Sequence, residues 1–228
     1  MLDQNEISSR VLGFLGDGAD VYARFVGAMF STCKKVLVAD VSGGEDLFVG
    51  TAGDCMRDTL YIRSITYTRS MDYLLQGINN YDVIIIYDDF MDKEGNFCKY
   101  ANLLDMSYIC VKPNRYAIAV LLRIATCFEN YPNIPYCHVF EGTEYDAKYW
   151  TVKDYWKFFS TKRKGPEKIF YIPSCPSDYQ AYLKLEYGVL CIRELSEEMQ
   201  EFLSWISQTC GMENNAIQIV QTQRLFCR

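Results

Sequence analysis

One stretch near the start of the sequence has the spacing of a phosphate-binding loop. Residues 10–25 read RVLGFLGDGADVYARF, which is an apolar run, a glycine-rich turn and then a helical pattern. A working loop, G-x-x-x-x-G-K-[ST], uses the lysine to contact phosphate and the hydroxyl to bind Mg²⁺. Here Ala19 stands where the lysine would be, and Asp20 where the hydroxyl would be. We interpret the stretch as a nucleotide loop without its chemistry, formed by Gly13, Gly16, Asp17, Gly18, Ala19 and Asp20.

Carboxylates follow two of the apolar runs. Asp40 comes after KKVLVA, and Asp88 and Asp89 come after YDVIIIY. In a parallel sheet the carboxyl ends of the strands border the ligand crevice, where such groups can hold Mg²⁺ or its waters. The alternative is that they are ordinary loop and helix-cap residues. Because Asp17 and Asp20 would repel phosphate, we expect no cofactor, and ATP with Mg²⁺ is the less favoured alternative.

Other kinds of chemistry have little support in the sequence. The only histidine, His138, lies in the apolar run YCHVF, so we interpret it as structural rather than catalytic. Lys112 could contact a phosphate, but we favour a solvated lysine at a strand end. The ten cysteines include no C-x-x-C pair, which argues against a zinc site. The formal charge of −6 argues against bulk nucleic-acid binding and against a polybasic membrane anchor.

The order of apolar runs and helical patterns predicts one α/β domain over residues 1–228. Continuous apolar runs such as VIII suit strands that are buried on both faces of a parallel sheet. The expected strands are residues 11–15, 35–39, 60–62, 83–87, 108–111, 138–140, 169–172 and 189–192. The expected helices are residues 21–33, 70–78, 116–129, 178–187 and 196–209. We expect the strands at 11–15, 35–39, 83–87 and 108–111 to be adjacent in the centre of a helix-flanked sheet.

Compartment and partners are expectations from composition. No signal-peptide pattern and no apolar run of membrane-spanning length is visible, and the cysteines read as small buried residues. We therefore expect a reduced, cytoplasmic protein. Residues 144–159, EYDAKYWTVKDYWKFF, are rich in aromatics and are interpreted either as a packed surface or as a partner-binding face. The candidate partner-binding residues are Tyr149, Trp150, Tyr155, Trp156 and Phe159.

The order of these segments resembles the ParA/MinD branch of phosphate-loop ATPases, and within it the TadZ/CpaE-like proteins of pilus assembly. The resembling stretches are residues 11–42, YDVIIIYDDF, LLDMSYICVKP and IFYIPSCPSDYQAYLKLEYGV. The resemblance implies a parallel-sheet fold and a class that dimerises on ATP and binds DNA, a membrane or a partner machine. The signature lysine is absent, and Tyr87 stands where the family has a strand-end Asp.

Three functions remain open from the sequence. The first is a non-catalytic scaffold that positions a membrane-associated assembly, such as a pilus or secretion apparatus. It would bind protein partners, could form a homodimer and would lie at the membrane only through a partner. The second is a nucleotide-binding switch without the lysine, and the third is unrelated enzyme chemistry on the same fold. A response-regulator receiver is a further alternative, since KKVLVAD and YICVKPN resemble its strands.

Overall fold

The computed structural model describes residues 9–42, 58–62, 64–90, 97–114, 116–160, 165–186 and 190–211, and every structural statement below refers to these residues. The strands are β1 Arg10–Gly16, β2 Val36–Asp40, β3 Thr59–Ile62, β4 Ile65–Thr68, β5 Val83–Asp88, β6 Met106–Val111, β7 Tyr136–Phe140 and β8 Ile169–Tyr171. The α-helices are α1 Ala19–Phe30, α3 Met71–Gly77, α4 Phe97–Tyr100, α5 Ala117–Phe128, α6 Glu144–Tyr149, α7 Val152–Ser160, α8 Pro176–Glu186 and α9 Glu197–Thr209. Short 3₁₀ helices cover Ile78–Asn80, Ala101–Leu103 and Ile192–Glu194.

The strands form one mainly parallel sheet in the order β3-β4-β2-β5-β1-β6-β7-β8. All neighbouring pairs are parallel except β3 and β4, which are antiparallel. The predicted centre of the sheet is confirmed, because β2, β5, β1 and β6 are adjacent. Almost every residue of these four strands is buried, as continuous apolar runs require when helices cover both faces.

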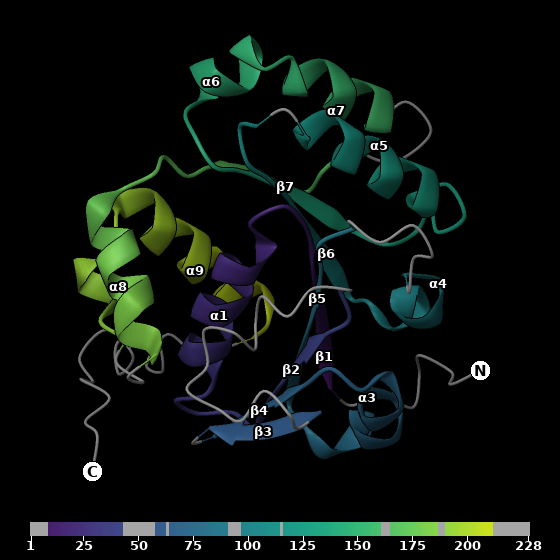
Figure 1. Ribbon diagram of the computed structural model, residues 1–228, viewed down its shortest axis with the longest axis vertical. Coiled ribbons are helices and arrows are strands. Elements are labelled where there is room, and N and C mark those ends of the chain that lie inside the picture. Colours follow the sequence, from purple (N-terminus) through teal and green to yellow (C-terminus); the bar gives the residue numbers. More distant parts are fainter. Residues whose placement is uncertain are drawn as a thin grey trace.

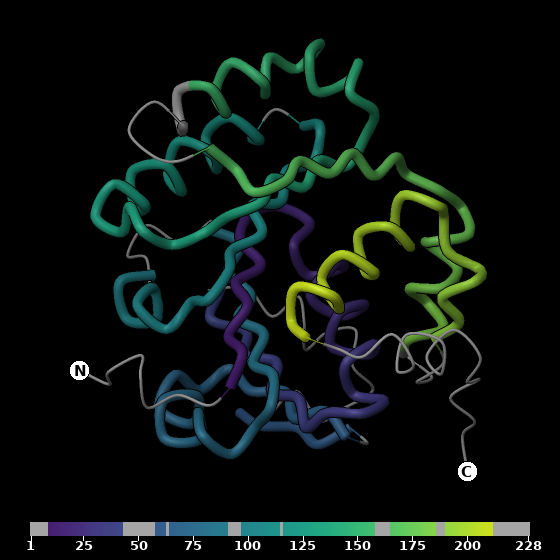
Figure 2. The backbone as a smooth tube through the Cα atoms, turned by 180° about the vertical axis from the view of Figure 1, so that it is seen from behind, coloured from purple at the N-terminus to yellow at the C-terminus, as the bar shows by residue number. Residues whose placement is uncertain are grey.

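Helices cover the two faces of the sheet in separate layers. One face packs against α1, α8 and α9, and the other packs against α3, α4, α5, α6 and α7 (Figure 1). The view from behind shows α8 and α9 side by side next to α1 (Figure 2), in agreement with the contacts of α1 with both helices. The site described below lies where this first layer meets the carboxyl ends of the strands.

Several expectations about the elements need correction. The strand expected at 189–192 does not form in its described part, since a 3₁₀ helix begins at Ile192 and the sheet ends at β8. Leu190 and Ile192 bury their side chains without strand pairing. Strand β4 and helices α4, α6 and α7 were not predicted as elements. Of the eight described cysteines, only Cys110 and Cys137 are buried, so the expectation that most are core residues is wrong.

The receiver alternative is also wrong. That fold has the strand order 2-1-3-4-5. Here β5 lies between β1 and β2, and further strands extend the sheet on both sides.

Candidate functional site

The turn between β1 and α1 is shorter than the predicted loop. Strand β1 ends at Gly16 and α1 begins at Ala19, so only Asp17 and Gly18 connect them. Gly13 lies inside the buried strand, and Ala19 and Asp20 already belong to the first helical turn. The eight-residue motif G-x-x-x-x-G-K-[ST] has no counterpart here as a loop. The spacing of Gly13 and Gly18 matches the motif, but β1 continues through Gly13 to Gly16.

The two glycines at the turn have backbone roles. Gly16 has φ +106° and Gly18 has φ +78°. Residues with a β-carbon rarely adopt these positive φ values, whereas glycine does so readily. A β-carbon at Gly16 would lie 2.4 Å from the carbonyl oxygen of Cys110, so the close approach of β1 and β6 also requires glycine there. These glycines are explained by turn geometry and strand packing without a bound anion.

Residues after β6 cover this turn. A β-carbon at Gly18 would lie 2.4 Å from Lys112 Cε, so the lysine side chain lies directly over the glycine. Asn114 donates a hydrogen bond from Nδ2 to Asp17 Oδ2. The sequence interpretation of Lys112 as a solvated lysine is therefore incomplete, because its aliphatic part packs on the turn and the residue is half-buried.

The carboxylates expected to share the crevice do not meet. Asp40 is opposite Tyr87 in the sheet register, so Asp40 and Asp88 point to opposite faces of the sheet. Asp40 accepts hydrogen bonds from the backbone and hydroxyl of Ser42, at 3.1 and 2.5 Å. Both carboxylates are buried, and each is held in local structure rather than aimed at a common centre.

Asp88 has partners of a similar kind. It accepts hydrogen bonds from the backbone N–H of Phe90 at 2.9 Å and from the Tyr100 hydroxyl at 2.7 Å. Burial and the Asp88 charge raise the pKa of Tyr100, so this hydroxyl remains a proton donor. Asp89 follows β5 and is half-buried. Within the described residues, no three His, Cys, Asp or Glu side chains are grouped closely enough to bind a metal ion.

The aromatic candidates divide into a surface set and a core residue. Tyr149 is 74% exposed and Trp150 is 37% exposed, and Tyr145 on the same helix, which sequence reasoning did not single out, is 75% exposed. Tyr155 is half-buried. Trp156 is buried and stacks on His138 with ring centroids 4.5 Å apart, so it is a core residue. The side chain of Phe159 lies outside the described part of the structure.

His138 is structural in the fold, as the apolar run around it predicts. It is fully buried in β7, and burial lowers its pKa from 6.5 to about 3. The ring is therefore neutral at physiological pH. Its neighbours are aromatic rings, with Tyr136 in edge contact at 5.3 Å and Trp156 stacked on it.

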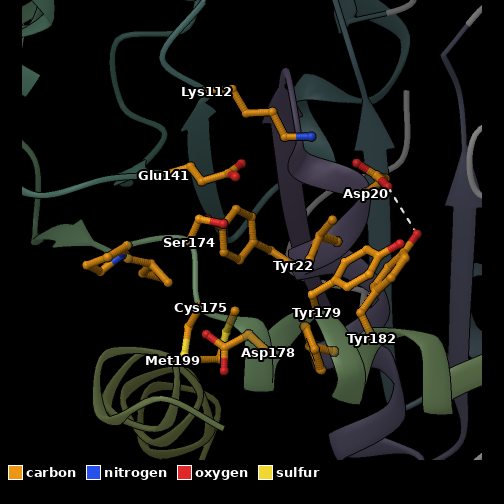
Figure 3. Close-up of a pocket in the computed structure, with 14 residues that line it drawn as sticks. Asp20, Tyr22, Lys112, Glu141, Ser174, Cys175, Asp178, Tyr179, Tyr182 and Met199 are labelled. Carbon is orange, nitrogen blue, oxygen red and sulfur yellow. Dashed lines mark hydrogen bonds between the residues drawn. The ribbon is translucent and has the colours of Figure 1, made fainter. Parts of the chain in front are cut away.

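A cavity of about 330 Å³ lies on the α1 side of the sheet, beside the turn (Figure 3). It is bounded by the first half of α1, the residues that follow β6, β7 and β8, the helix α8, and Met199 of α9. The lining residues that carry polar groups are Asp20, Tyr22, Lys112, Glu141, Ser174, Cys175, Asp178, Tyr179 and Tyr182. Of the site residues predicted from sequence, only Asp20 lines this cavity. Lys112, which was interpreted as a solvated lysine, and Glu141, which sequence reasoning missed, both immediately follow strands, and that position is the sequence signal that could have found Glu141.

Carboxylates dominate the electrostatics of this cavity. Burial raises the pKa of Glu141, Lys112 opposes this shift, and Asp17 and Asp20 add to it. Burial is also the main reason that the pKa of the Tyr22 hydroxyl is well above 10, with contributions from Cys110, Glu141, Asp178 and Asp20. Asp178 already accepts two hydrogen bonds, from the backbone and the hydroxyl of Ser196, at 2.7 and 2.6 Å.

Comparisons with known proteins identify the fold. No model of a known protein family matches the chain, and no curated protein matches it significantly. Among solved structures, it is similar to MinD in the MinC:MinD cell division complex of Aquifex aeolicus, with TM-score 0.60 and 15% identity over 88% of this chain and 96% of that one. It is also similar to the ATP complex of a McdA variant from Cyanothece, with TM-score 0.61 and 13% identity over 91% of this chain and 98% of that one.

A third neighbour is a ParA-family ATPase from Chlorobium tepidum, with TM-score 0.57 and 17% identity over 86% of this chain and 98% of that one. The chain therefore has the fold of the ParA/MinD phosphate-loop ATPases, as the sequence resemblance implied. Among the described helices, none has the length and apolar character needed to cross a bilayer.

Proposed function

We propose that this chain is a non-catalytic positioning protein with the ParA/MinD fold, acting as a scaffold for a membrane-associated assembly such as a pilus or secretion apparatus. The observation that carries the proposal is the β1–α1 turn. It has two residues, no lysine, and Lys112 and Asn114 packed against it. A phosphate loop wraps its anion in backbone N–H groups and adds the charge of a loop lysine, and this short turn has no lysine.

Charge at the turn supports the same conclusion. Asp17 is in the turn and Asp20 is in the first turn of α1, where a γ-phosphate would need cations. Asp40 and Asp88 face opposite sides of the sheet, so they cannot jointly hold one Mg²⁺. These features favour a protein whose assembly depends on direct protein contacts.

The partner surface that we propose is the aromatic surface formed by Tyr145 and Tyr149 of α6 and by Trp150, the residue that follows this helix. The rings of Tyr149 and Trp150 are in edge contact at 6.1 Å, so the two side chains form one aromatic patch. Exposed aromatic residues are typical anchors of protein interfaces. The MinD neighbour is itself in a complex with a protein, MinC. The partner would bring this chain to the membrane from the cytoplasm.

Phosphate release tests the non-catalytic part of the proposal. With ATP and Mg²⁺, the purified protein should release phosphate no faster than a protein-free blank. Turnover that is lost in Asp40→Asn or Asp88→Asn, while circular dichroism shows both variants folded, would contradict the proposal. Glu198→Gln, an exposed change on α9, is the matched control.

The second candidate is a nucleotide-binding switch that uses Lys112 in place of the missing loop lysine. It is favoured by one observation, the position of Lys112 over Gly18 and at the edge of the cavity. Calorimetric titration with ATP and Mg²⁺ separates the two candidates. The scaffold proposal expects no binding heat, and the switch expects heat that disappears in Lys112→Ala.

A further inference from the structure

The cavity beside α1 carries an inference that is independent of the scaffold proposal. We propose that it binds a small organic cation, an amine or guanidinium with an apolar body, through Glu141 and Asp20 and against tyrosine rings. Its volume of about 330 Å³ is within the range of small-molecule sites. Phe25, Ile172 and Pro173 contribute apolar wall, which suits the body of such a ligand.

The Tyr22 side chain lines this cavity, and its hydroxyl has no protein partner among the described residues. Tyr22 is only 4% exposed, and in the described part of the structure its hydroxyl makes no hydrogen bond. In the close-up its side chain extends from α1 toward Ser174 and Glu141 (Figure 3). The hydroxyl is open to the cavity, since the buried polar atoms that have no partner in the described residues do not include it. A ligand with a polar head would supply the missing partner of Tyr22.

Charged groups at the same end of the cavity are also unpaired. Within the described residues, neither the Glu141 carboxylate nor the Lys112 ammonium group makes a hydrogen bond or an ion pair. Asp20 accepts only a long hydrogen bond, 3.5 Å, from the Tyr182 hydroxyl. These groups lie around one space in Figure 3. An ammonium or guanidinium group that enters this space can pair with Glu141 and Asp20.

The sign of the charge selects a cation. Besides burial, Asp17 and Asp20 both act on Glu141 to raise its pKa, and among the described residues Lys112 acts on it in the opposite direction. The carboxylates that line the cavity are Asp20, Glu141 and Asp178, and Lys112 is the one cationic side chain among its described lining residues, so the cavity carries more negative than positive groups. An incoming anion would add to the repulsion, whereas an ammonium or guanidinium group would relieve it.

The tyrosine rings of Tyr179 and Tyr182 form another wall of the cavity. Tyr179 is 64% exposed at the edge of the cavity, so its ring is available to a ligand. The Arg24 guanidinium already lies 5.4 Å from the Tyr182 ring centroid, so this wall tolerates a cation against its aromatic faces. Cations over tyrosine rings are attracted by the ring quadrupole. Aromatic walls together with carboxylates are a combination suited to amines.

Protection of Cys175 from iodoacetamide gives a local readout, because Cys175 lines the cavity. Three probes with the same phenyl body differ in charge: 2-phenylethylammonium, neutral 2-phenylethanol and anionic 3-phenylpropionate. Peptide mass spectrometry then measures alkylation at Cys175 and at Cys33, which is exposed outside the cavity and serves as the internal control. We expect 2-phenylethylammonium to slow alkylation of Cys175 alone, and the other two probes to have little effect.

A matched pair of variants tests the carboxylate. Glu141→Gln should raise the amine concentration needed for half protection by about tenfold, the usual size of a hydrogen bond to a charged group. Glu198→Gln should leave this concentration unchanged, and Asp20→Asn repeats the test if Glu141→Gln does not fold. Equal protection by the three probes, stronger protection by 3-phenylpropionate, or no protection by the amine would each overturn the proposal.

Discussion

The side chain of Lys112 lies directly on Gly18, so that a β-carbon at residue 18 would come within 2.4 Å of Lys112 Cε. The residue after strand β6 thus packs on the turn that connects β1 to α1. In a phosphate-loop protein the space over such a turn is where the anion binds. Here the space next to the turn contains a lysine side chain and is bordered by Asp17 and Asp20. Because Lys112 both packs on Gly18 and lines the cavity, a change in the turn should also move a wall of the cavity.

Gly18→Ala should destabilise the fold by more than backbone strain alone. The left-handed conformation costs an alanine about 1–2 kcal/mol, and the new methyl group must also displace Lys112. Gly211→Ala is the matched control, because Gly211 has φ +70° and no described residue lies within 4 Å of its added β-carbon. Urea denaturation measures both. Gly18→Ala should lower the free energy of unfolding more than Gly211→Ala does, and this difference should disappear when Lys112 is also changed to Ala. Equal losses for the two glycine variants would contradict the packing of Lys112 on Gly18.

His138 should make the fold sensitive to acid. Its pKa is about 3 in the fold and 6.5 without burial, so between these pH values the unfolded chain binds a proton that the folded chain does not. The free energy of unfolding should therefore decrease as the pH falls below 6.5, by roughly 1 kcal/mol per pH unit from this residue. In His138→Phe, which keeps a ring against Trp156, this part of the pH dependence should vanish. An unchanged slope in urea denaturation between about pH 6.5 and about pH 4 would contradict the prediction.

The two tryptophans of the α6–α7 segment should respond differently to replacement. Trp156→Ala removes a buried ring from the core and should lower the free energy of unfolding by about 3–5 kcal/mol. Trp150 is 37% exposed, so Trp150→Ala should cost less than Trp156→Ala, and Tyr149→Ala, at a ring that is 74% exposed, should stay within about 0.5 kcal/mol of the parent chain. Thermal and urea denaturation provide the measurements. A large loss of stability from Tyr149→Ala would mean that the aromatic surface at α6 supports the fold rather than a partner.

Cys175 should have a reactive thiol whose reactivity depends on its neighbour. The Cys175 Sγ and Ser177 Oγ atoms are 3.1 Å apart, and hydrogen bonds from Ser177 lower the pKa of the Cys175 thiol. Because the thiolate is the reacting form, Ser177→Ala should shift the pH profile of Cys175 alkylation to higher pH. The rate at Cys33 in the same sample is the control. An unshifted profile would show that Ser177 does not stabilise the thiolate.

The central fold could be predicted from the sequence because its strands are long, continuous apolar runs. VIII and KVLVA suit burial between two helical layers, which predicts a parallel sheet with these strands at its centre, whereas the order of the strands comes from the structure. Strand β4, ITYT, is short and alternates apolar with polar residues, and it forms because β2 offers an open edge. Pairing of that kind is not visible in local sequence.

The candidate site was harder to predict than the fold. The glycine spacing suggested an eight-residue loop, but the strand runs on to Gly16 and leaves a two-residue turn. Asp40 and Asp88 both follow strands, yet the register places them on opposite faces. Glu141 and Tyr22 are brought together by β7 and α1, and no local pattern relates residues so far apart in the chain.

Sedimentation velocity with and without ATP and Mg²⁺ tests the scaffold proposal most directly. In the ParA/MinD ATPases that the sequence resembles, nucleotide completes the dimer, whereas this chain has no loop lysine and has acidic residues at the turn. We therefore expect the same sedimentation coefficient, and the same self-association or partner binding, in the presence and absence of nucleotide. Tyr149→Ala together with Trp150→Ala should weaken any association equally in both conditions. A change from monomer to dimer only when ATP and Mg²⁺ are added would contradict the scaffold and establish a nucleotide switch.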